Sequence, residues 1–571
     1  MIVGIDLGTT NSLIAHWDGE TRLVANALGS NLTPSVVSID SDGEVLVGAA
    51  ARERTVSHPD MTAAAFKRYM GSPRKIALGT HQFRAEELAS FVIRSLLHDA
   101  TAAFGERPDE AVITVPAYFS DAQRRATRRA GELAGLKVDR VLNEPTAAAL
   151  AYGLLQDGKA QDGPILVFDL GGGTFDVSVL ELTDGIVEVR ATAGDNFLGG
   201  EDFDDAVAAW FVADTGIAAP DPLMPGSDGQ GYAARLQSAA RRARESLTGA
   251  SQAVMTVRLP GGGEASAALT TDAFAEMAAP LLERLRRPVA RALADSRIRP
   301  DALANVVLAG GATRMPIVRR EAARMFGRLP LQHFDPDEVV ARGAGVQAGL
   351  KARSADLSDV VLTDVAPYTL GIAVGDGCGT TGGPDRLRML PVIERNTTIP
   401  VSRMEEVRPA ADFTKRVLIE VFQGEARLTR DNIPLGSFEL ALSPKRVADQ
   451  PIQVRFTYNV NGILEVSALE EVTGKSERIV IRHSAYAPEG AEAEARLAEL
   501  AALKLHPRDR AAAKLLLARA ERCYEEQLGP VRDRLGTEIA AYVEVLERQD
   551  DADIEAQALQ LERILRELDA A

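Results

Sequence analysis

Two segments of the chain repeat one short pattern. Residues 4–11 read G-I-D-L-G-T-T-N and residues 167–176 read V-F-D-L-G-G-G-T-F-D, so each contains an apolar strand, an aspartate, a glycine-rich turn and a threonine. The two aspartates, Asp6 and Asp169, stand 163 positions apart. A repeated strand-and-turn unit inside one α/β region predicts two similar lobes that face each other across a cleft.

The repeated turns have the composition of a phosphate-binding site. Glycine lets a hairpin backbone approach a polyphosphate closely and direct its N–H groups at the oxygens. Asp6 and Asp169, at strand ends, can hold a hydrated Mg²⁺. One such aspartate alone more often only makes a turn, but two matching copies favour a site. The chain has neither a Walker-type loop nor a dinucleotide G-x-G-x-x-G after a strand. The residues expected at the phosphates are Gly8, Thr9, Thr10, Asn11, Gly171, Gly172, Gly173 and Thr174.

Composition divides the 571 residues into successive regions. Strand-like runs alternate with Ala-rich helical stretches up to about residue 356, which indicates an α/β architecture. A short apolar segment between acids follows at 357–364. Period-2 strands then predict an antiparallel β-sandwich over 365–484, and helical spacing predicts a small bundle over 485–571.

Charge, cysteine content and hydropathy exclude several classes of protein. The net charge of −17 and the lack of a basic patch argue against a nucleic-acid partner. Arg124–Arg129 and Arg235–Arg244 are spaced like solvent-facing helix surfaces. Two isolated cysteines, Cys378 and Cys523, exclude a disulfide scaffold and suit a reducing compartment. No run reaches the length of a membrane span, and Ile2–Asp6 reads as a strand rather than a signal peptide. We therefore expect a cytoplasmic protein with no membrane partner.

The motifs together resemble the heat-shock protein 70 (DnaK-type) chaperone family. The resemblance is carried by G-I-D-L-G-T-T-N, V-P-A-Y-F, N-E-P-T-A-A-A, D-L-G-G-G-T-F-D and G-G-A-T-R-M-P, in the family's order, and continues through N-T-T-I-P, Q-G-E and N-G-I-L-E-V-S-A. The segment A-G-D-N-F-L-G-G-E-D-F is most similar to the short HscC-like branch. The resemblance implies an actin-like (ribonuclease H-like), two-lobed α/β ATPase at 1–356, a linker at 357–364, a peptide-binding β-sandwich at 365–484 and a short helical lid at 485–571.

The resemblance also implies the residues of an ATPase centre. Lys67 is expected beside the γ-phosphate, and Glu144 joins Asp6 and Asp169 around Mg²⁺. Thr174 and Asp176 position the attacking water or the γ-phosphate. Phosphoryl transfer depends mainly on such positioning and on electrostatics, so no Ser–His–Asp set is required.

Other positions match the family's residues on the adenosine side of the cleft and the residues that relay the nucleotide state to the partner domain. Pro116 and Arg124 correspond to its proline–arginine relay, although a strand-ending proline and a surface arginine are the plain alternative. Arg241 replaces an expected acid, which puts the hydrogen bonds to the ribose in doubt. The residues implied for adenosine are Arg244, Thr248, Gly310, Gly311, Arg314 and Asp337.

The linker and the sandwich each have a structural and a functional interpretation. Val360, Val361 and Leu362 belong either to a buried strand edge or to a segment that docks on the ATPase in one nucleotide state. Apolar period-2 residues are usually core, but the resemblance places Ile372, Val417 and Ile419 at a pocket for an aliphatic side chain of an extended peptide. It places Ala410, the fourth predicted peptide-binding residue, at an arch position.

The expected activity is an ATP-driven chaperone cycle with ATP/ADP and Mg²⁺ as cofactors. Its expected partners are unfolded or extended client polypeptides and a J-domain co-chaperone. The fit of a standard exchange factor is uncertain, because the stretches Gly71–Asp109 and Gly249–Thr271 are short for the family. We expect a monomer. The alternatives are a sugar or acetate kinase of the actin-like superfamily, which would not need residues 365–571, and an ATP-binding holdase or exchange-factor-like relative with little turnover.

Overall fold

The computed structural model divides the chain into two compact units, Met1–Val360 (unit 1) and Val361–Ala571 (unit 2). The division falls inside the segment that the sequence predicted as a linker. The structure describes residues 1–39, 45–155, 163–183, 186–220, 227–260, 263–331, 334–354, 357, 361–375, 387–459, 462–481, 516, 520, 530–548 and 551–569.

Unit 1 contains two sheets with matching strand arrangements. In the first sheet, β1 pairs antiparallel with β2 and parallel with β10; in the second, β12 pairs antiparallel with β13 and parallel with β17. The repeated D-L-G turns connect β1 to β2 and β12 to β13, which agrees with the predicted duplication. The strands of the first sheet, in spatial order, are β11 (Val141–Asn143), β10 (Glu110–Val115), β1 (Ile2–Leu7), β2 (Asn11–Trp17) and β3 (Thr21–Leu23), with β4 (Thr33–Pro34) on β2. Those of the second sheet within unit 1 are β17 (Asn305–Ala309), β12 (Gly163–Leu170), β13 (Phe175–Thr183) and β14 (Ile186–Asp195).

Each sheet has its own hydrophobic core. Strand β12 is apolar along nearly its whole length and buried on both faces, as expected of a strand covered by helices on each side. Phe168 and Phe203 belong to the core around the second sheet, whereas Ile5 and Phe66 belong to the core around the first. The two lobes are therefore separate packing units within unit 1.

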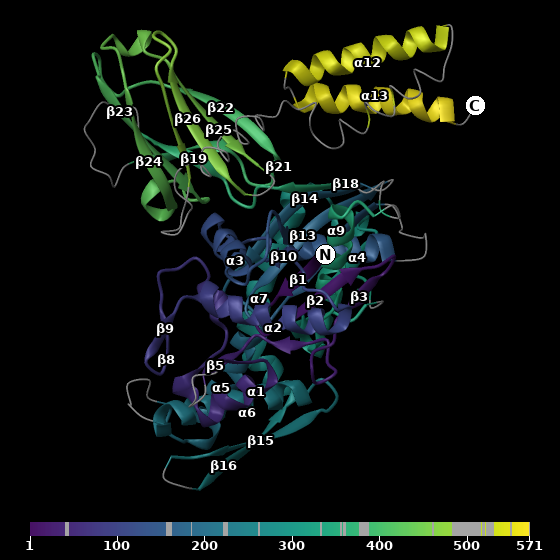
Figure 1. The fold of residues 1–571 in the computed structure, drawn as a ribbon, viewed down its shortest axis with the longest axis vertical. Coiled ribbons are helices and arrows are strands. Elements are labelled where there is room, and N and C mark those ends of the chain that lie inside the picture. The colour runs from purple at the N-terminus through teal and green to yellow at the C-terminus, as the bar shows by residue number, and fades with distance from the viewer. Residues whose placement is uncertain are drawn as a thin grey trace. The chain divides into compact units, whose positions relative to one another are not determined.

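Helices surround both sheets (Figure 1). Helix α9 packs on β1 and β2 and against α4, which begins at Glu144. Ser120 caps α3 by accepting a hydrogen bond from the Gln123 N–H, as a helix N-terminus requires. The helices of unit 1 are α1 (Ala49–Ser57), α2 (Ala85–Phe104), α3 (Asp121–Leu133), α4 (Glu144–Leu155), α5 (Gly200–Thr215), α6 (Ser227–Ser246), α7 (Thr271–Ser296), α8 (Pro316–Phe326) and α9 (Val339–Lys351).

Short elements complete unit 1. The 3-10 turns are η1 (Pro59–Met61), η2 (Phe66–Tyr69), η3 (Pro300–Ala302) and η4 (Gly311–Arg314). Three small sheets are formed by β5 (Val37–Ile39) with β6 (Val45–Val47) and β7 (Thr62–Ala63), by β8 (Ile76–Leu78) with β9 (His81–Phe83), and by β15 (Gln252–Arg258) with β16 (Glu264–Thr270).

Unit 2 contains two four-stranded antiparallel sheets with one shared core, which agrees with the predicted β-sandwich. Alternate residues of β23 are buried, as expected for a strand with one face in a core. One sheet consists of β20 (Arg388–Ile393), β19 (Leu370–Val374), β23 (Arg416–Gln423) and β24 (Ile433–Ala441), and the other of β22 (Val401–Val407), β25 (Ile452–Tyr458), β26 (Leu464–Glu470) and β27 (Ser476–Val480). Short elements of this unit are β18 (Val361–Val365), β21 (Thr398–Ile399), η7 (Thr429–Asp431) and η8 (Val447–Asp449).

Two helices close the chain, α12 (Pro530–Arg548) and α13 (Asp551–Asp569). They lie side by side (Figure 1) and share an apolar seam that includes Leu535, Tyr542 and Leu561. This agrees with the helical character predicted for the C-terminal region. Most of residues 485–529, which were also predicted to belong to the lid, lie outside the described residues.

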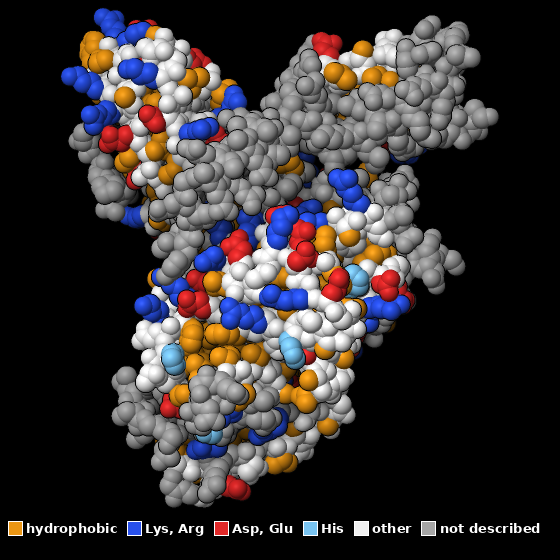
Figure 2. Space-filling view, in the orientation of Figure 1, with side chains coloured by type: hydrophobic (Ala, Val, Ile, Leu, Met, Phe, Trp, Pro, Cys, Tyr) orange, Lys and Arg blue, Asp and Glu red, His pale blue; other side chains and the backbone are white. Residues whose placement is uncertain are grey.

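Basic and acidic side chains are interspersed over the described face of unit 1 in Figure 2, so this face carries no large field of one sign. In the part of the chain that the structure describes, we find no helix that is both long and apolar enough to cross a membrane.

The contact between α9 and α4 leads to a prediction on stability. A Cβ at Gly343 would collide with the backbone carbonyl of Ala147 in α4. Although alanine favours a helix by about 1 kcal/mol over glycine, the collision is with backbone and cannot relax easily. We expect Gly343→Ala to lower the free energy of unfolding of unit 1 by roughly 1–3 kcal/mol, measured by urea denaturation.

The control is Gly249→Ala, because an added Cβ at Gly249 meets nothing within 4 Å. We expect this variant to stay within about 0.5 kcal/mol of the parent protein. Equal stability of the two variants would show that the helices do not pack as closely as the structure has them.

Candidate functional site

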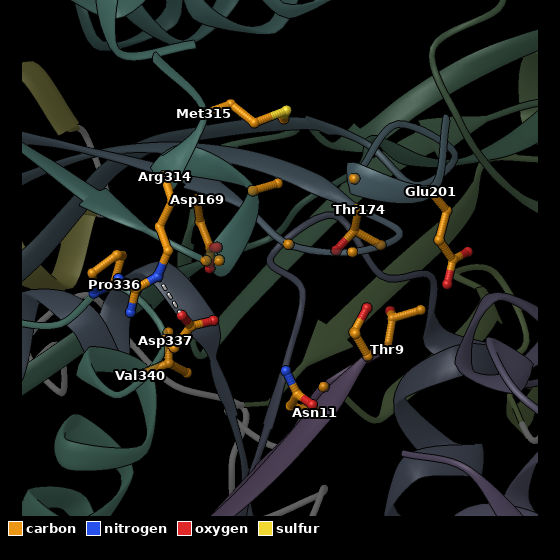
Figure 3. A pocket seen from close by; sticks show the side chains of 18 of the residues that line it. Thr9, Asn11, Asp169, Thr174, Glu201, Arg314, Met315, Pro336, Asp337 and Val340 are labelled. Carbon is orange, nitrogen blue, oxygen red and sulfur yellow. Dashed lines mark hydrogen bonds and ion pairs between the residues drawn. The ribbon is translucent and has the colours of Figure 1, made fainter. Parts of the chain in front are cut away.

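A cavity of about 420 Å³ lies where the two D-L-G turns meet (Figure 3). It collects predicted site residues from distant parts of unit 1, from the first strand to the start of α9. The predicted residues that line it are Asp6, Gly8, Thr9, Thr10, Asn11, Lys67, Glu144, Asp169, Gly171, Gly172, Thr174, Arg244, Thr248, Gly310, Gly311, Arg314 and Asp337.

Two predicted residues, Gly173 and Asp176, are not part of the cavity wall. A Cβ at Gly173 would lie 2.8 Å from the Arg68 Nε and 2.8 Å from the Thr9 Cγ2, so this glycine sits beneath both side chains. Asp176 is buried at the start of β13, where its Oδ1 accepts a hydrogen bond from the Tyr118 N–H at 2.9 Å. Asp176 can therefore act on the cavity only from just behind its wall.

Glycine is required where the two turns approach each other. A Cβ at Gly172 would collide with the Thr10 hydroxyl of the opposite turn. Within the first turn itself, a Cβ at Gly8 would collide with the Asn11 carbonyl. The second turn is also tied to the first turn of α5, because the Gly200 N–H donates to the Gly171 carbonyl at 2.9 Å. Two backbone turns held this close offer N–H groups from both sides to an anion between them.

The first turn is fixed by neighbours that the sequence did not indicate. Ser35 Oγ donates to the Gly8 carbonyl at 2.8 Å, and its N–H donates to the Thr10 carbonyl at 2.9 Å. Arg52 of α1 donates from Nη2 to Asn11 Oδ1 at 2.8 Å. These bonds fix the conformation of the turn from within the protein.

A buried lysine and several buried carboxylates form the floor of the cavity. Lys67, only 3% exposed, lies in η2 and donates to Glu144 Oε1 at 2.7 Å. Thr114 Oγ1 donates to Asp6 Oδ1 at 2.9 Å. Asp169 Oδ2 is buried and has no hydrogen-bond partner among the described residues. A buried carboxylate oxygen of this kind is suited to a ligand such as a hydrated cation.

Burial shifts the protonation of these acids upward. Desolvation, with a further contribution from Glu144, raises the pKa of Asp6 to about 7. The same two causes raise the pKa of Asp176 to about 7 and hold the pKa of Asp169 well above its usual range. Lys67 acts in the opposite direction on all three. The site therefore has an excess of acceptor charge that a bound cation would relieve.

The described residues include no group of three or more His, Cys, Asp or Glu side chains that closes directly on a metal ion. Asp6, Glu144 and Asp169 nevertheless share one cavity. This arrangement fits a cation that keeps several of its waters and meets the carboxylates through them, as Mg²⁺ commonly does.

The opposite end of the cavity contains arginines fixed by aspartates. Arg314 Nε donates to Asp337 Oδ2 at 2.7 Å, the bond drawn in Figure 3, and Arg314 also pairs with Asp335. Carboxylates along the guanidinium edge leave its face available for stacking on a base.

Arg241 and Arg244 share one buried carboxylate. Asp204 Oδ1 accepts from Arg244 Nε at 2.6 Å, and Asp204 Oδ2 lies 3.3 Å from Arg241 Nε. Both arginines line the cavity. Arg241, the arginine that replaces the expected acid, therefore still faces the cavity. It offers a hydrogen-bond donor there, whereas the acid would have offered an acceptor.

Arg124, one of the two residues of the predicted proline–arginine relay, is more buried than an ordinary arginine on a helix surface would be. Arg124 is 8% exposed and donates to the Phe119 and Ala117 carbonyls and, at 2.7 Å, to Asn143 Oδ1. The interpretation of this residue as part of a solvent-facing helix surface is therefore wrong, because its guanidinium turns inward to backbone acceptors. Pro116 directly follows β10.

The linker residues fall partly outside the described chain. Val360 is not described, whereas Val361 and Leu362 begin β18, a strand of unit 2. Strand β18 pairs with β21, with Asp364 opposite Ile399. Docking of this segment on the ATPase stays a prediction.

The four predicted peptide-binding residues do not form one cluster. Ile372 and Ile419 belong to the core of the sandwich, Val417 is half-buried against that core, and Ala410 is exposed on the segment before β23. Val417 and Ala410 are thus the accessible members. Most of the neighbouring Gly-rich loop, 376–386, lies outside the described residues.

Sequence reasoning missed several residues of the cavity wall, including Glu201, Asp204, Met315, Pro336 and Val340. Glu201 and Asp204 lie at the start of α5. Glu201 belongs to the G-G-E-D-F segment that served only for comparison with the family, and Asp204 directly follows that segment. The signal available was a glycine pair followed by acids at a helix N-terminus. Met315 lies in the quoted G-G-A-T-R-M-P motif and Pro336 directly precedes the predicted Asp337, so the signal available for both was their place beside predicted residues.

Comparison with known proteins agrees with this geometry. The family model described as Hsp70 protein matches residues 2–76 and 72–570. The chaperone protein dnaK3 of Thermosynechococcus vestitus is 43% identical over 512 residues, which cover 84% of this chain and 73% of that protein. The chain therefore belongs to the Hsp70 family, whose members are ATP-dependent molecular chaperones and ATPases.

Proposed function

We propose that the cavity of unit 1 binds Mg²⁺–ATP and hydrolyses it, and that the β-sandwich of unit 2 captures extended hydrophobic segments of unfolded proteins. The observation that carries the proposal is the convergence of both D-L-G turns, the buried Lys67 and the buried acids on one cavity. The duplicated sheets on each side of it support the finer assignment of an actin-like, two-lobed ATPase.

The residues present suit a hydrated Mg²⁺. Asp6, Glu144 and Asp169 would hold its waters, and the unpartnered Asp169 oxygen supports this assignment. When bound, the ion would supply positive charge that neutralises the negative charge developing on the phosphate oxygens. The raised pKa values of Asp6 and Asp169 agree with carboxylates that ionise fully only beside a cation.

Hydrolysis requires a water oxygen to bond to the γ-phosphorus while the bond from that phosphorus to the bridging oxygen breaks. Lys67, fixed by Glu144, would lie beside the transferred group and stabilise its negative charge. Asp176, with a pKa of about 7, is held by the Tyr118 N–H and would orient the water and accept its proton near neutral pH. The turn N–H groups and the Thr9, Thr10 and Thr174 hydroxyls would hold the phosphates in line.

The arginine end would bind the nucleoside. Arg314, held edge-on by Asp337, would stack on the base, and Gly310 and Gly311 line the same cavity. Arg244 and Thr248 line the same end of the cavity. Since Arg241 also faces the cavity, we propose that the ribose meets guanidinium donors here.

The proposals on partners and location rest on membership of the Hsp70 family and not on contacts seen in the structure. We propose that a J-domain co-chaperone accelerates hydrolysis and that the protein acts as a monomer. The cytoplasmic location, the HscC-like branch and the four-part division of the chain stay predictions, and the fit of a standard exchange factor stays an open question. The match to the Hsp70 family over nearly the whole chain does not favour the alternative of a sugar or acetate kinase.

The first test is single-turnover ATP hydrolysis with and without an extended, aliphatic-rich peptide. We expect peptide to speed hydrolysis. We expect Lys67→Ala to bind ATP but to hydrolyse it at least about 100-fold more slowly, because a preorganised charge at the phosphoryl group is removed. A different result is that the parent protein hydrolyses ATP at the same rate with and without peptide, while Lys67→Ala still hydrolyses it slowly. That result would support the ATPase proposal and contradict the coupling between peptide binding and hydrolysis.

The second test concerns pH and stability. The folded-state pKa of Asp176 is about 7 and its ordinary value is 3.8, so the folded protein keeps this proton to higher pH than the unfolded chain does. The cost of ionising Asp176 is therefore absent below about pH 4, grows toward pH 7 and persists above it. We expect Asp176→Asn to raise the Tm of the nucleotide-free protein by about 3 °C or more at pH 8, and by much less near pH 4.

The same variant should lose at least about tenfold in hydrolysis rate, because its amide cannot accept the proton. Asp18→Asn, at an exposed position, serves as the control and should change neither quantity. A lower Tm for Asp176→Asn at pH 8, or a difference that is the same at every pH, would contradict the role given to burial.

The third test addresses the sandwich. Val417 and Leu418 are neighbours on β23 that face opposite sides of the sheet, the first half-buried and the second 52% exposed. If Val417 borders a peptide pocket, Val417→Phe should weaken binding of a fluorescent aliphatic peptide roughly tenfold by filling the pocket. The matched Leu418→Phe variant should bind like the parent protein, as measured by fluorescence anisotropy. Equal affinities for all three proteins would leave Val417 a core residue only.

A further inference from the structure

Arg68 connects the two lobes of unit 1 beside the cavity. It lies in η2 (Phe66–Tyr69), and its neighbour Phe66 is packed into the core of the first lobe. Its partners lie in the first turn of α5, and the next residue of that helix, Phe203, is packed into the core of the second lobe. The Arg68 side chain therefore spans between elements that are anchored in different cores.

The contacts of Arg68 are charge-assisted and partly shielded from water. Its Nη2 donates to Asp202 Oδ2 at 2.6 Å, and its Nε lies 3.3 Å from Glu201 Oε2. The arginine side chain is 15% exposed and each carboxylate side chain is 19% exposed. At this depth an arginine–carboxylate bond is stronger than a fully exposed ion pair.

The guanidinium also covers the second phosphate turn. A Cβ at Gly173 would lie 2.8 Å from the Arg68 Nε. The same turn is bonded to α5 through the Glu201 N–H, which donates to the Gly172 carbonyl at 2.9 Å. Arg68 thus holds the segment that carries Lys67 against both the turn and the helix that supports the turn.

Stabilisation of α5 alone does not account for this arrangement. The Asp202 carboxylate already accepts the Gly199 N–H at 2.7 Å, and acids in the first turn already suit the helix dipole. Arg68 is not needed for either effect. What it adds is a link across the cleft, because the lobes cannot separate at this point until both of its ion pairs break.

We propose that Arg68 is a cross-cleft latch, a positioning residue that sets how fast a nucleotide leaves the cavity. The inference rests on the proposed nucleotide site and adds the control of release to it. A nucleotide whose phosphates lie between the two turns is retained while the latch is closed, and each opening requires Arg68 to leave Asp202 and Glu201. The latch acts on dissociation more than on association, because an open cleft already lacks these bonds.

The test is a stopped-flow measurement on the full chain with N-methylanthraniloyl-ADP and Mg²⁺, in which excess unlabelled ADP displaces the probe. We expect Arg68→Ala to release the probe roughly tenfold faster with an association rate within about twofold of the parent protein. Arg68→Lys keeps the charge but loses the two-pronged contact, so its release rate should lie between the two. Asp202→Asn removes the partner instead and should also speed release.

The matched control is Arg286→Ala. Arg286 Nε lies 2.7 Å from the buried Glu321, but both residues belong to the second lobe, on α7 and α8. This variant should lower the Tm without changing the release rate by more than about twofold.

Different results overturn different parts of the proposal. Release from Arg68→Ala within twofold of the parent protein removes the latch and leaves the nucleotide site intact. An equal change in association and dissociation, accompanied by a loss of Tm like that of Arg286→Ala, assigns Arg68 a structural role and also removes the latch. Failure of the parent protein to bind the probe removes the nucleotide site itself, and the latch with it.

Discussion

The close approach of two backbone turns is the constraint on which unit 1 depends. Gly172 faces the Thr10 hydroxyl of the opposite turn, with no space for a Cβ between them. Each turn is the end of a β-hairpin in its own sheet, so the contact fixes how the two lobes face each other. Because each hairpin carries an aspartate just before its turn, the same contact brings Asp6 and Asp169 into one cavity.

The buried acids of the site destabilise the folded protein when they are ionised. Burial raises the pKa of Asp6 and of Asp176 to about 7, and Glu144 adds repulsion that one lysine offsets only in part. Such a centre is stabilised when a cation and a polyphosphate enter together, since the cation relieves the acids and the turns supply donors for the phosphates. The hydrophobic cores on both sides provide the stability that offsets the cost of these buried acids.

The sequence predicted those features of the fold and the site that depend on consecutive residues. The duplicated turns, the strands that precede them and the change from α/β to all-β composition depend on local pattern, and the structure agrees with each of them. Contacts between distant residues were not available in this way. Nothing near Arg124 indicated that its guanidinium would turn inward to Asn143, and nothing near Arg68 indicated Asp202 as its partner. The first pair is created by packing within the first lobe and the second by the packing of the two lobes. Neither is contained in a short window of sequence.

Arg241 shows why a single departure from a family pattern is hard to interpret before the fold is known. In the sequence it removes an acid from α6 and suggests a poorer nucleoside site. In the structure, Asp204 of α5 supplies a buried carboxylate to both Arg241 and Arg244. One carboxylate orients two guanidinium groups by their Nε atoms, in the way that Asp337 orients Arg314. The acid at this end of the cavity therefore lies behind the arginines rather than beside the ligand, so the cavity presents donors where an acid on α6 would have presented an acceptor.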